Sequence, residues 1–333
     1  MMKTGSELPT PSLKKEGLFA TGPTIYTFIV IVAFLIGYAY YLRHFTILSC
    51  QADLYNSDRY LSDCEAEEYG DYEHGAFWFD LEPAALEFAG KADVLFLGTS
   101  RVQMAFSTQA TADWFSAASR SYYLMGFGFD ENVLFTEGVL SRIHPKAAVY
   151  VINVDEFFRR SESRPMNTIL HDPNARDLYE MKRRWQGLHR AICTVLSKLC
   201  GNNYVIFRSR KTGAYTKKIN KTKPAPASYD EVVSPDVVKN ETAAAISFFA
   251  HQDVKRECVI LTMVPTVETK IGNANAIAKA LGMDLIVPEN MTGIETFDGS
   301  HLDQPSAERW SRAFLQSAGP KIQSCFERQR VVP

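Results

Sequence analysis

The sequence lacks the features that define several functional classes. Its 333 residues carry a formal net charge of -2, so the totals give no reason to expect a nucleic acid as partner. Its six cysteines show neither the C-x-x-C spacing of a zinc site nor the density of a disulfide scaffold. We therefore expect no metal, no cofactor and no nucleic acid, and the length suits one large α/β domain with an attachment.

The few cysteines predict at most two short disulfide loops. Cys50 with Cys64, and Cys193 with Cys200, each lie close enough in sequence to close a loop if the chain faces an oxidising compartment. Cys258 lies in an apolar run, where an unpaired thiol is the expected state. Pairing therefore depends on the compartment that the rest of the sequence indicates.

One long apolar segment, residues 25–42, contains no charged residue. Its eighteen residues, at about 1.5 Å each in a helix, nearly match the hydrocarbon thickness of a bilayer. A buried core helix would usually show a polar face, and a cleaved signal peptide would usually have a shorter leader and a small-residue cleavage site. We therefore predict an uncleaved, single transmembrane anchor.

The charges around this segment predict its orientation. Lys3, Lys14 and Lys15 precede it, whereas Arg43 and then an acidic stretch follow it. The positive-inside rule places the N-terminal tail, residues 1–24, in the cytoplasm and everything after the anchor outside it.

Charge is also segregated along the outer part of the chain. Between Asp53 and Asp80 nearly every charged residue is acidic, whereas from Arg159 to Lys223 sixteen Lys/Arg accompany four Asp/Glu. We predict opposite electrostatic fields on different parts of the surface. The expected units are an acidic juxtamembrane segment (43–90), a single large domain (91–320), a basic insertion within it (about 159–235) and a C-terminal tail (321–333).

Short apolar runs alternate with helical patterns in this domain, which is typical of a doubly wound sheet. Right-handed crossovers then predict a three-layer α/β/α sandwich with a parallel five-stranded sheet and a site at the carboxyl ends of the strands. The predicted strands cover residues 93–97, 121–125, 147–153, 258–263 and 284–287. The predicted helices cover 108–117, 131–142, 241–254, 273–281 and 306–317, with an amphipathic helix at 175–200 whose apolar residues include Met181, Trp185, Leu188 and Ile192.

Two motifs at opposite ends of the domain carry reactive side chains. The first strand runs into Ser100 at a predicted helix start, where free N–H groups stabilise negative charge, although serine there is more often only an N-cap. Asp298 and His301 lie on a loop before the last helix. Such a carboxylate can orient the imidazole while the other ring nitrogen accepts a proton from a serine. A polar loop that merely caps the last helix is the alternative.

Together the two motifs resemble the first and last sequence blocks of the SGNH, or GDSL-like, hydrolase superfamily. In that family the nucleophilic serine follows the first strand, and a D-x-x-H motif precedes the final helix. The resemblance covers roughly residues 93–317 and implies a catalytic triad of Ser100, Asp298 and His301.

The family's two middle blocks supply the oxyanion hole, and here the match is partial. Gly126 occupies the place of the glycine whose N–H donates, but Leu124 and Met125 stand where an asparagine often precedes it. Asn153 aligns with the asparagine that donates from its side chain, with Asp155 as an alternative occupant. A tight turn at Gly126 and a strand cap at Asn153 are the structural alternatives.

Such departures recur in membrane-anchored members of the superfamily, among them alginate and peptidoglycan O-acetyltransferases and the D-alanyl transfer protein of teichoic acid synthesis. The resemblance implies a bacterial cell-membrane protein whose periplasmic domain is a serine acyltransferase or esterase. O-acetylation of an envelope or exported polysaccharide through a Ser acyl-enzyme is the leading expectation, with a multi-pass membrane-bound O-acyltransferase as partner. A deacetylating carbohydrate esterase and a catalytically silent scaffold in a polysaccharide export complex are the alternatives.

The basic insertion fits an anionic polymer as substrate. Its lysines, Lys217 and Lys218 among them, are expected to form a cationic surface that concentrates such a polymer near the membrane. An ordinary solvated face, or contact with anionic lipid head groups, accounts for the same residues equally well.

Overall fold

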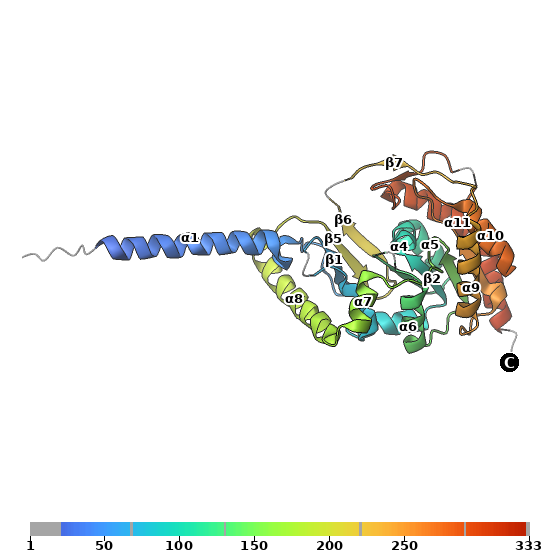
Figure 1. Ribbon diagram of the computed structural model, residues 1–333, viewed down its shortest axis with the longest axis horizontal. Coiled ribbons are helices and arrows are strands. Elements are labelled where there is room, and N and C mark those ends of the chain that lie inside the picture. The colour runs from blue at the N-terminus through green and yellow to red at the C-terminus, as the bar shows by residue number, and fades with distance from the viewer. Residues whose placement is uncertain (1–20, 67–68, 130, 220–221, 290, 331–333) are drawn as a thin grey trace, which may run out of the picture.

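The computed structural model describes residues 21–66, 69–129, 131–219, 222–289 and 291–330 (Figure 1). Most of the predicted cytoplasmic tail, including Lys3, Lys14 and Lys15, lies outside the described residues. The last three residues of the chain lie outside them as well.

The predicted anchor is helix α1 (Thr21–Phe45), which extends away from the rest of the described chain (Figure 1). Its stretch Thr24–His44 is long and apolar enough to cross a membrane, with a mean hydropathy of 2.0, and none of it is buried. A single-pass anchor and a signal sequence share this length and composition.

A parallel sheet of four strands, in the order β3-β2-β4-β8, forms the centre of the domain. Every residue of these strands is buried, as is typical when helices cover both faces of a parallel sheet. The first four predicted strands are thereby confirmed. They are β2 (Val94–Thr99), β3 (Tyr122–Phe127), β4 (Val149–Asn153) and β8 (Val259–Thr262).

The predicted fifth strand, residues 284–287, is wrong. Leu285 forms a single parallel bridge with Leu261 of β8 instead of a strand. Pro288 follows directly in the sequence and has no N–H with which to continue the ladder.

Helices pack on both faces of the sheet. Leu95 and Ile152 belong to one apolar cluster, whereas Phe96 and Val151 belong to the other, which is the alternation expected along strands. The first cluster includes residues of α3 (Pro83–Lys91), α6 (Val133–Ile143), α9 (Pro235–Phe249) and α10 (Ile271–Leu281). The second includes residues of α4 (Ser100–Phe106), α5 (Gln109–Ala117) and α11 (Gln304–Arg330).

Helix α11 is longer than the sequence predicts. It continues to Arg330 and buries Ile322, Cys325 and Phe326 in the second cluster. Residues 321–330 are therefore part of the domain rather than a separate tail.

The acidic segment and the basic insertion form one antiparallel sheet together, which we call the accessory sheet. Its order is β1-β5-β6, with β1 from the acidic segment and the other two strands from the insertion. The strands are β1 (Arg59–Cys64), β5 (Val205–Ser209) and β6 (Tyr215–Lys218), with α2 (Tyr72–Trp78), α7 (Arg164–His171) and α8 (Ala175–Val195) beside them. The short elements are η1 (Ile47–Ser49), η2 (Ser197–Leu199), η3 (Arg256–Cys258), β7 (Ala225–Pro226) and β9 (Glu295–Thr296).

The opposite charges of these two segments pair with each other. Arg208 Nη1 lies 2.9 Å from Glu73 Oε2, and both side chains are almost completely buried. The predicted separation of charge therefore does not hold at four of the sixteen basic residues, where folding brings the two segments together. Three further pairs join them, namely Asp71 with Lys182, Glu82 with Arg210, and Asp53 with Lys218.

All six cysteines are paired. Both short loops that the sequence predicts are present, as Cys50–Cys64 and Cys193–Cys200. The expectation of an unpaired Cys258 is wrong, because the packing of η3 against α11 brings this residue to Cys325, 67 positions later.

Candidate active site

Ser100, His301 and Asp298 form a continuous hydrogen-bonded line. Ser100 Oγ lies 2.7 Å from His301 Nε2, and His301 Nδ1 lies 2.8 Å from Asp298 Oδ2. Ser100 is the first residue of α4, directly after β2, whereas the other two residues lie on the loop between β9 and α11. Packing of α11 on α4 brings the two motifs together.

Asp298 is held as an ionised hydrogen-bond acceptor. Its Oδ1 accepts the backbone N–H groups of Ser300 at 2.9 Å and of His301 at 2.8 Å. Partial burial opposes ionisation, but the hydrogen bonds and the charge interaction with His301 prevail and lower the pKa of Asp298 to about 2. This acceptor favours the proton on His301 Nδ1, which leaves Nε2 free to accept the proton of Ser100.

Arg101 directly follows Ser100 in the sequence and connects the start of α4 to the loop that carries His301. Its Nε donates to Ser300 Oγ at 3.0 Å, and its Nη1 forms an ion pair with Asp155 Oδ2. Asp155, the alternative oxyanion residue of the sequence analysis, therefore acts as the counter-ion of Arg101. No motif in the sequence indicated this contact.

Lys217 of the basic insertion lies beside the triad loop. Its Nζ is 4.3 Å from the ring centroid of Phe297, and that ring stacks on His301 with centroids 5.7 Å apart. Burial lowers the pKa of Lys217 to about 8, although Asp298 and Asp303 favour its charged form. No pattern in the sequence distinguishes this lysine from its basic neighbours.

Gly126 does not supply a free N–H to the site. Its N–H donates to Gln103 Oε1 at 3.1 Å. A Cβ atom at this position would lie 2.5 Å from the Thr99 carbonyl oxygen and 2.8 Å from Val102 Cγ1. We therefore correct its expected role: the glycine lets the start of α4 pack closely on β3.

Asn153 keeps an unused donor at the carboxyl end of β4. Its side chain is fully buried, and its Oδ1 accepts the N–H of Val264 at 2.8 Å, which fixes the orientation of the amide. Its Nδ2 has no hydrogen-bond partner among the described residues. A Cβ atom on Gly98, two residues before Ser100, would lie 3.1 Å from Asn153 Cβ. Buried amide donors are rarely left unpaired, so this one fits an oxyanion ligand.

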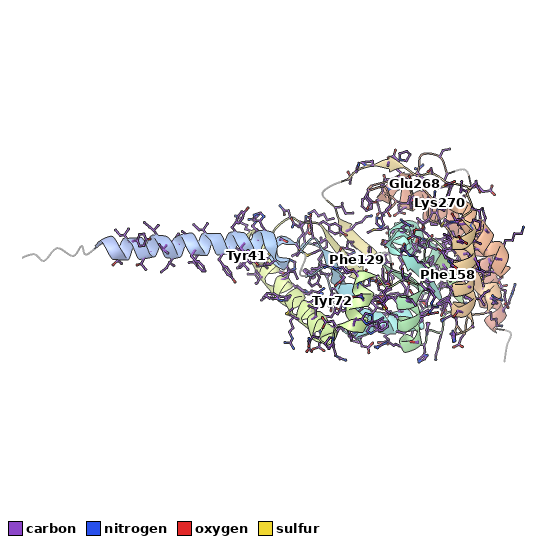
Figure 2. The ribbon with its side chains drawn as sticks, in the orientation of Figure 1. Tyr41, Tyr72, Phe129, Phe158, Glu268 and Lys270 are labelled. Carbon is purple, nitrogen blue, oxygen red and sulfur yellow. A yellow bond between two sulfur atoms is a disulfide. The ribbon has the colours of Figure 1, made fainter. Side chains whose placement is uncertain are left out.

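A cleft with a volume of about 1130 Å³ is lined by Arg101 and by Gly299 of the triad loop. It lies beyond the carboxyl ends of β4 and β8, next to the point between β2 and β4 where the strand order reverses, the usual place for a ligand in such sheets. Burial and the charge of Glu156 raise the pKa of Glu241 in its wall to about 7. Figure 2 labels three further wall residues, Phe158, Glu268 and Lys270.

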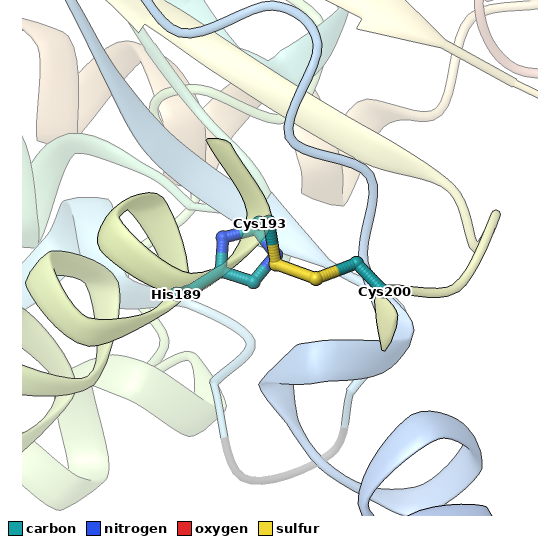
Figure 3. A group of neighbouring side chains, drawn as sticks. All are labelled: His189, Cys193 and Cys200. Atoms are coloured by element: carbon teal, nitrogen blue, oxygen red, sulfur yellow. A yellow bond between two sulfur atoms is a disulfide. The ribbon is translucent and has the colours of Figure 1, made fainter. Parts of the chain in front are cut away.

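A second cluster of potential ligand atoms consists of His189, Cys193 and Cys200 (Figure 3). The two sulfur atoms are bonded to each other, and both ring nitrogens are engaged, Nδ1 with Tyr55 Oη and Nε2 with the Cys50 carbonyl, each at 2.9 Å. In this state the cluster has no free ligand for a metal.

Comparison with known proteins found no match to any family model, curated protein or solved structure. Function therefore has to be inferred from the geometry and chemistry of the site.

Proposed function

We propose that this protein is an SGNH-like serine esterase or acyltransferase that works through an acyl-enzyme on Ser100. The hydrogen-bonded line from Ser100 through His301 to Asp298 is the observation that carries the proposal. His301 Nε2 removes the Ser100 proton as Oγ attacks the acyl carbonyl carbon, and then donates it to the leaving oxygen. Water or a sugar hydroxyl resolves the ester by the reverse sequence.

Two donors can stabilise the negative oxygen that forms during the attack. One is the backbone N–H of Ser100 at the start of α4, and the other is Asn153 Nδ2, which has no hydrogen-bond partner in the described part of the chain. The hydrogen bond from Val264 N–H to Asn153 Oδ1 already fixes the orientation of the amide, so Nδ2 needs no reorganisation when negative charge develops.

The proposed location is the outer side of a bacterial cell membrane, with α1 as a single-pass anchor and the domain in the periplasm. The apolar helix α1 and the lysines before it support this orientation. The pairing of all six cysteines supports an oxidising compartment for the domain.

The proposed substrate is an acetylated or acetyl-accepting polysaccharide of the envelope. Support comes from the cleft beside Arg101, whose volume of about 1130 Å³ and mixed charged and apolar wall suit sugar residues. The family resemblance adds a multi-pass membrane-bound O-acyltransferase as the donor partner.

Ser100→Ala tests the proposal directly. The wild-type chain should hydrolyse a chromogenic acetyl ester and be labelled at Ser100 by a fluorophosphonate, and Ser100→Ala should lose both. Ser116→Ala, which removes an exposed hydroxyl from α5, is the matched control and should keep both. Wild-type turnover by folded Ser100→Ala would refute the triad. A soluble oligosaccharide acceptor then separates transfer from hydrolysis, because only transfer yields an acetylated sugar.

A scaffold without catalysis is the second candidate, and one observation favours it. Gly126 N–H, the donor that the family uses, is engaged by Gln103 here. A folded wild-type chain that fluorophosphonate does not label at Ser100 would support this candidate over the enzyme.

A further inference from the structure

Helix α8 buries both polar and apolar residues against the domain, Tyr179 and Cys193 among the latter, and exposes a second set of apolar side chains. Lys182, Gln186 and His189 are buried, whereas five apolar residues recur every three or four positions along the neighbouring, outward side of the helix. We call these five the α8 stripe. They are Met181 (48% exposed), Trp185 (47%), Leu188 (46%), Ile192 (partly exposed) and Val195 (79%).

The buried polar side fixes which way α8 faces. Lys182 Nζ donates to the Gly70 carbonyl at 2.8 Å, and Gln186 Nε2 donates to Tyr69 Oη at 2.7 Å. Rotation of the helix to bury the stripe would break these buried contacts. The outward apolar side is therefore built into the fold, and a large exposed apolar surface of this kind usually marks an interaction site.

The stripe continues into the place where α1 meets the domain. Beyond Val195 follow Leu196, directly before η2, and Leu199, the last residue of η2, which are 52% and 49% exposed. Arg43 Nη1, near the end of α1, donates to the Lys198 carbonyl at 2.9 Å. Figure 1 shows that α8 ends beside the end of α1 and lies obliquely along the side of the domain nearest to it. If α1 crosses a bilayer, this end of the stripe lies at the bilayer surface.

The charges near the stripe suit anionic lipid. Arg184, Arg190 and Lys198 are exposed, and none of the three forms an ion pair with an acidic side chain among the described residues. Tryptophan and cationic side chains beside a stripe of apolar residues are typical of a helix that lies in the interface of a membrane.

We infer that the α8 stripe docks into the lipid interface of the membrane that α1 crosses, with Trp185 among the acyl chains near the head groups. This inference rests on the anchor role of α1 in the proposed function, and not on the catalytic role of Ser100. It places α8 as a second attachment that holds the domain against the bilayer in one orientation.

Quenching of tryptophan fluorescence by brominated lipid tests the inference on the full chain. The chain is reconstituted into vesicles of phosphatidylcholine and phosphatidylglycerol whose acyl chains carry bromine. Of its four tryptophans, Trp185 should supply most of the quenched emission, so that Trp185→Phe lowers the quenched fraction roughly twofold or more. Trp114→Phe, which removes a partly buried tryptophan of α5, is the matched control; because it removes only unquenched emission, it should not lower that fraction.

Extraction with alkaline carbonate separates the two membrane claims. A chain that stays in the vesicles with equal quenching in wild type and Trp185→Phe overturns the docking of α8 alone. A chain that washes off at high pH, but shows quenched Trp185 emission before the wash, keeps the docking and overturns the anchor. A chain that washes off and is never quenched overturns both. Ester hydrolysis by Ser100 is measured separately in detergent and tests neither claim.

Discussion

Asn153→Ala distinguishes an oxyanion residue from a strand cap, because only the oxygen end of this amide has a partner among the described residues. The substitution takes the acceptor from the buried Val264 N–H, which should lower the free energy of unfolding by about 1–3 kcal/mol. It also removes Nδ2, which has no partner among the described residues. If Nδ2 donates to the oxyanion, kcat should fall by about 10²–10³ while KM for an acetyl ester stays nearly constant.

Thr262→Val is the matched control for this substitution. Thr262 pairs with Asn153 across β4 and β8, is fully buried, and donates from Oγ1 to the Ile286 carbonyl at 2.8 Å. Loss of this hydrogen bond should lower the free energy of unfolding by about 1–3 kcal/mol, the penalty for one unpaired buried group. It removes no donor from the site. Stability is measured by urea unfolding and kcat by ester hydrolysis below the unfolding transition. Equal kcat values for the two variants would refute the oxyanion role of Asn153.

Three further predictions concern groups around the site. Arg101→Met leaves the Asp155 carboxylate, which is 12% exposed, without the cation of its ion pair. The free energy of unfolding should then fall by about 1–3 kcal/mol and kcat by about tenfold. Arg101→Lys should restore the free energy of unfolding more fully than it restores kcat. The pKa of Glu241 is about 7 in the folded chain, against an ordinary value of 4.5. At a pH between these two values the carboxyl group keeps its proton in the folded chain and loses it in the unfolded chain, so the free energy of unfolding falls as pH rises. In thermal unfolding, Glu241→Gln should have the same free energy of unfolding as wild type at pH 4 and exceed it by at most about 3 kcal/mol at pH 8. The same excess at both pH values would contradict the raised pKa. Cys258→Ser with Cys325→Ser opens a loop of 67 residues and should cost about 4 kcal/mol in denaturant titration, a difference that reductant should abolish.

Local pattern was sufficient for the central sheet and for the two motifs. Apolar runs of strand length predicted β2, β3, β4 and β8, since strands buried on both faces tolerate few polar residues. Because β2 leads directly into Ser100, and Asp298 and His301 share a loop, the sequence also predicted which side chains the fold brings together. The fifth strand failed because one proline, Pro288, outweighs an apolar run that is otherwise suitable.

Contacts between distant segments were beyond the reach of local pattern. The partner of Gly126 N–H is Gln103, a residue of α4 whose glutamine side chain gives no sign of its target. Cys258 looked like a core thiol because its partner lies in the extended part of α11. Helix α8 was correctly predicted as amphipathic, but the pattern alone does not say which side faces inward, and buried hydrogen bonds from Lys182 and Gln186 decide that.

The accessory sheet joins the acidic segment to the basic insertion, two segments of opposite charge that are far apart in the sequence. Its strand β1 follows α1 within a segment closed by the Cys50–Cys64 disulfide, and its strand β6 carries Lys217 onto Phe297 beside His301. Burial of an ion pair stabilises a fold only weakly relative to apolar residues, but it specifies strongly which segments meet. The acidic segment that follows α1 pairs in this way with the basic insertion, through four ion pairs. Weakening those pairs should therefore disturb the position of the triad loop relative to α1 before it disturbs the central sheet.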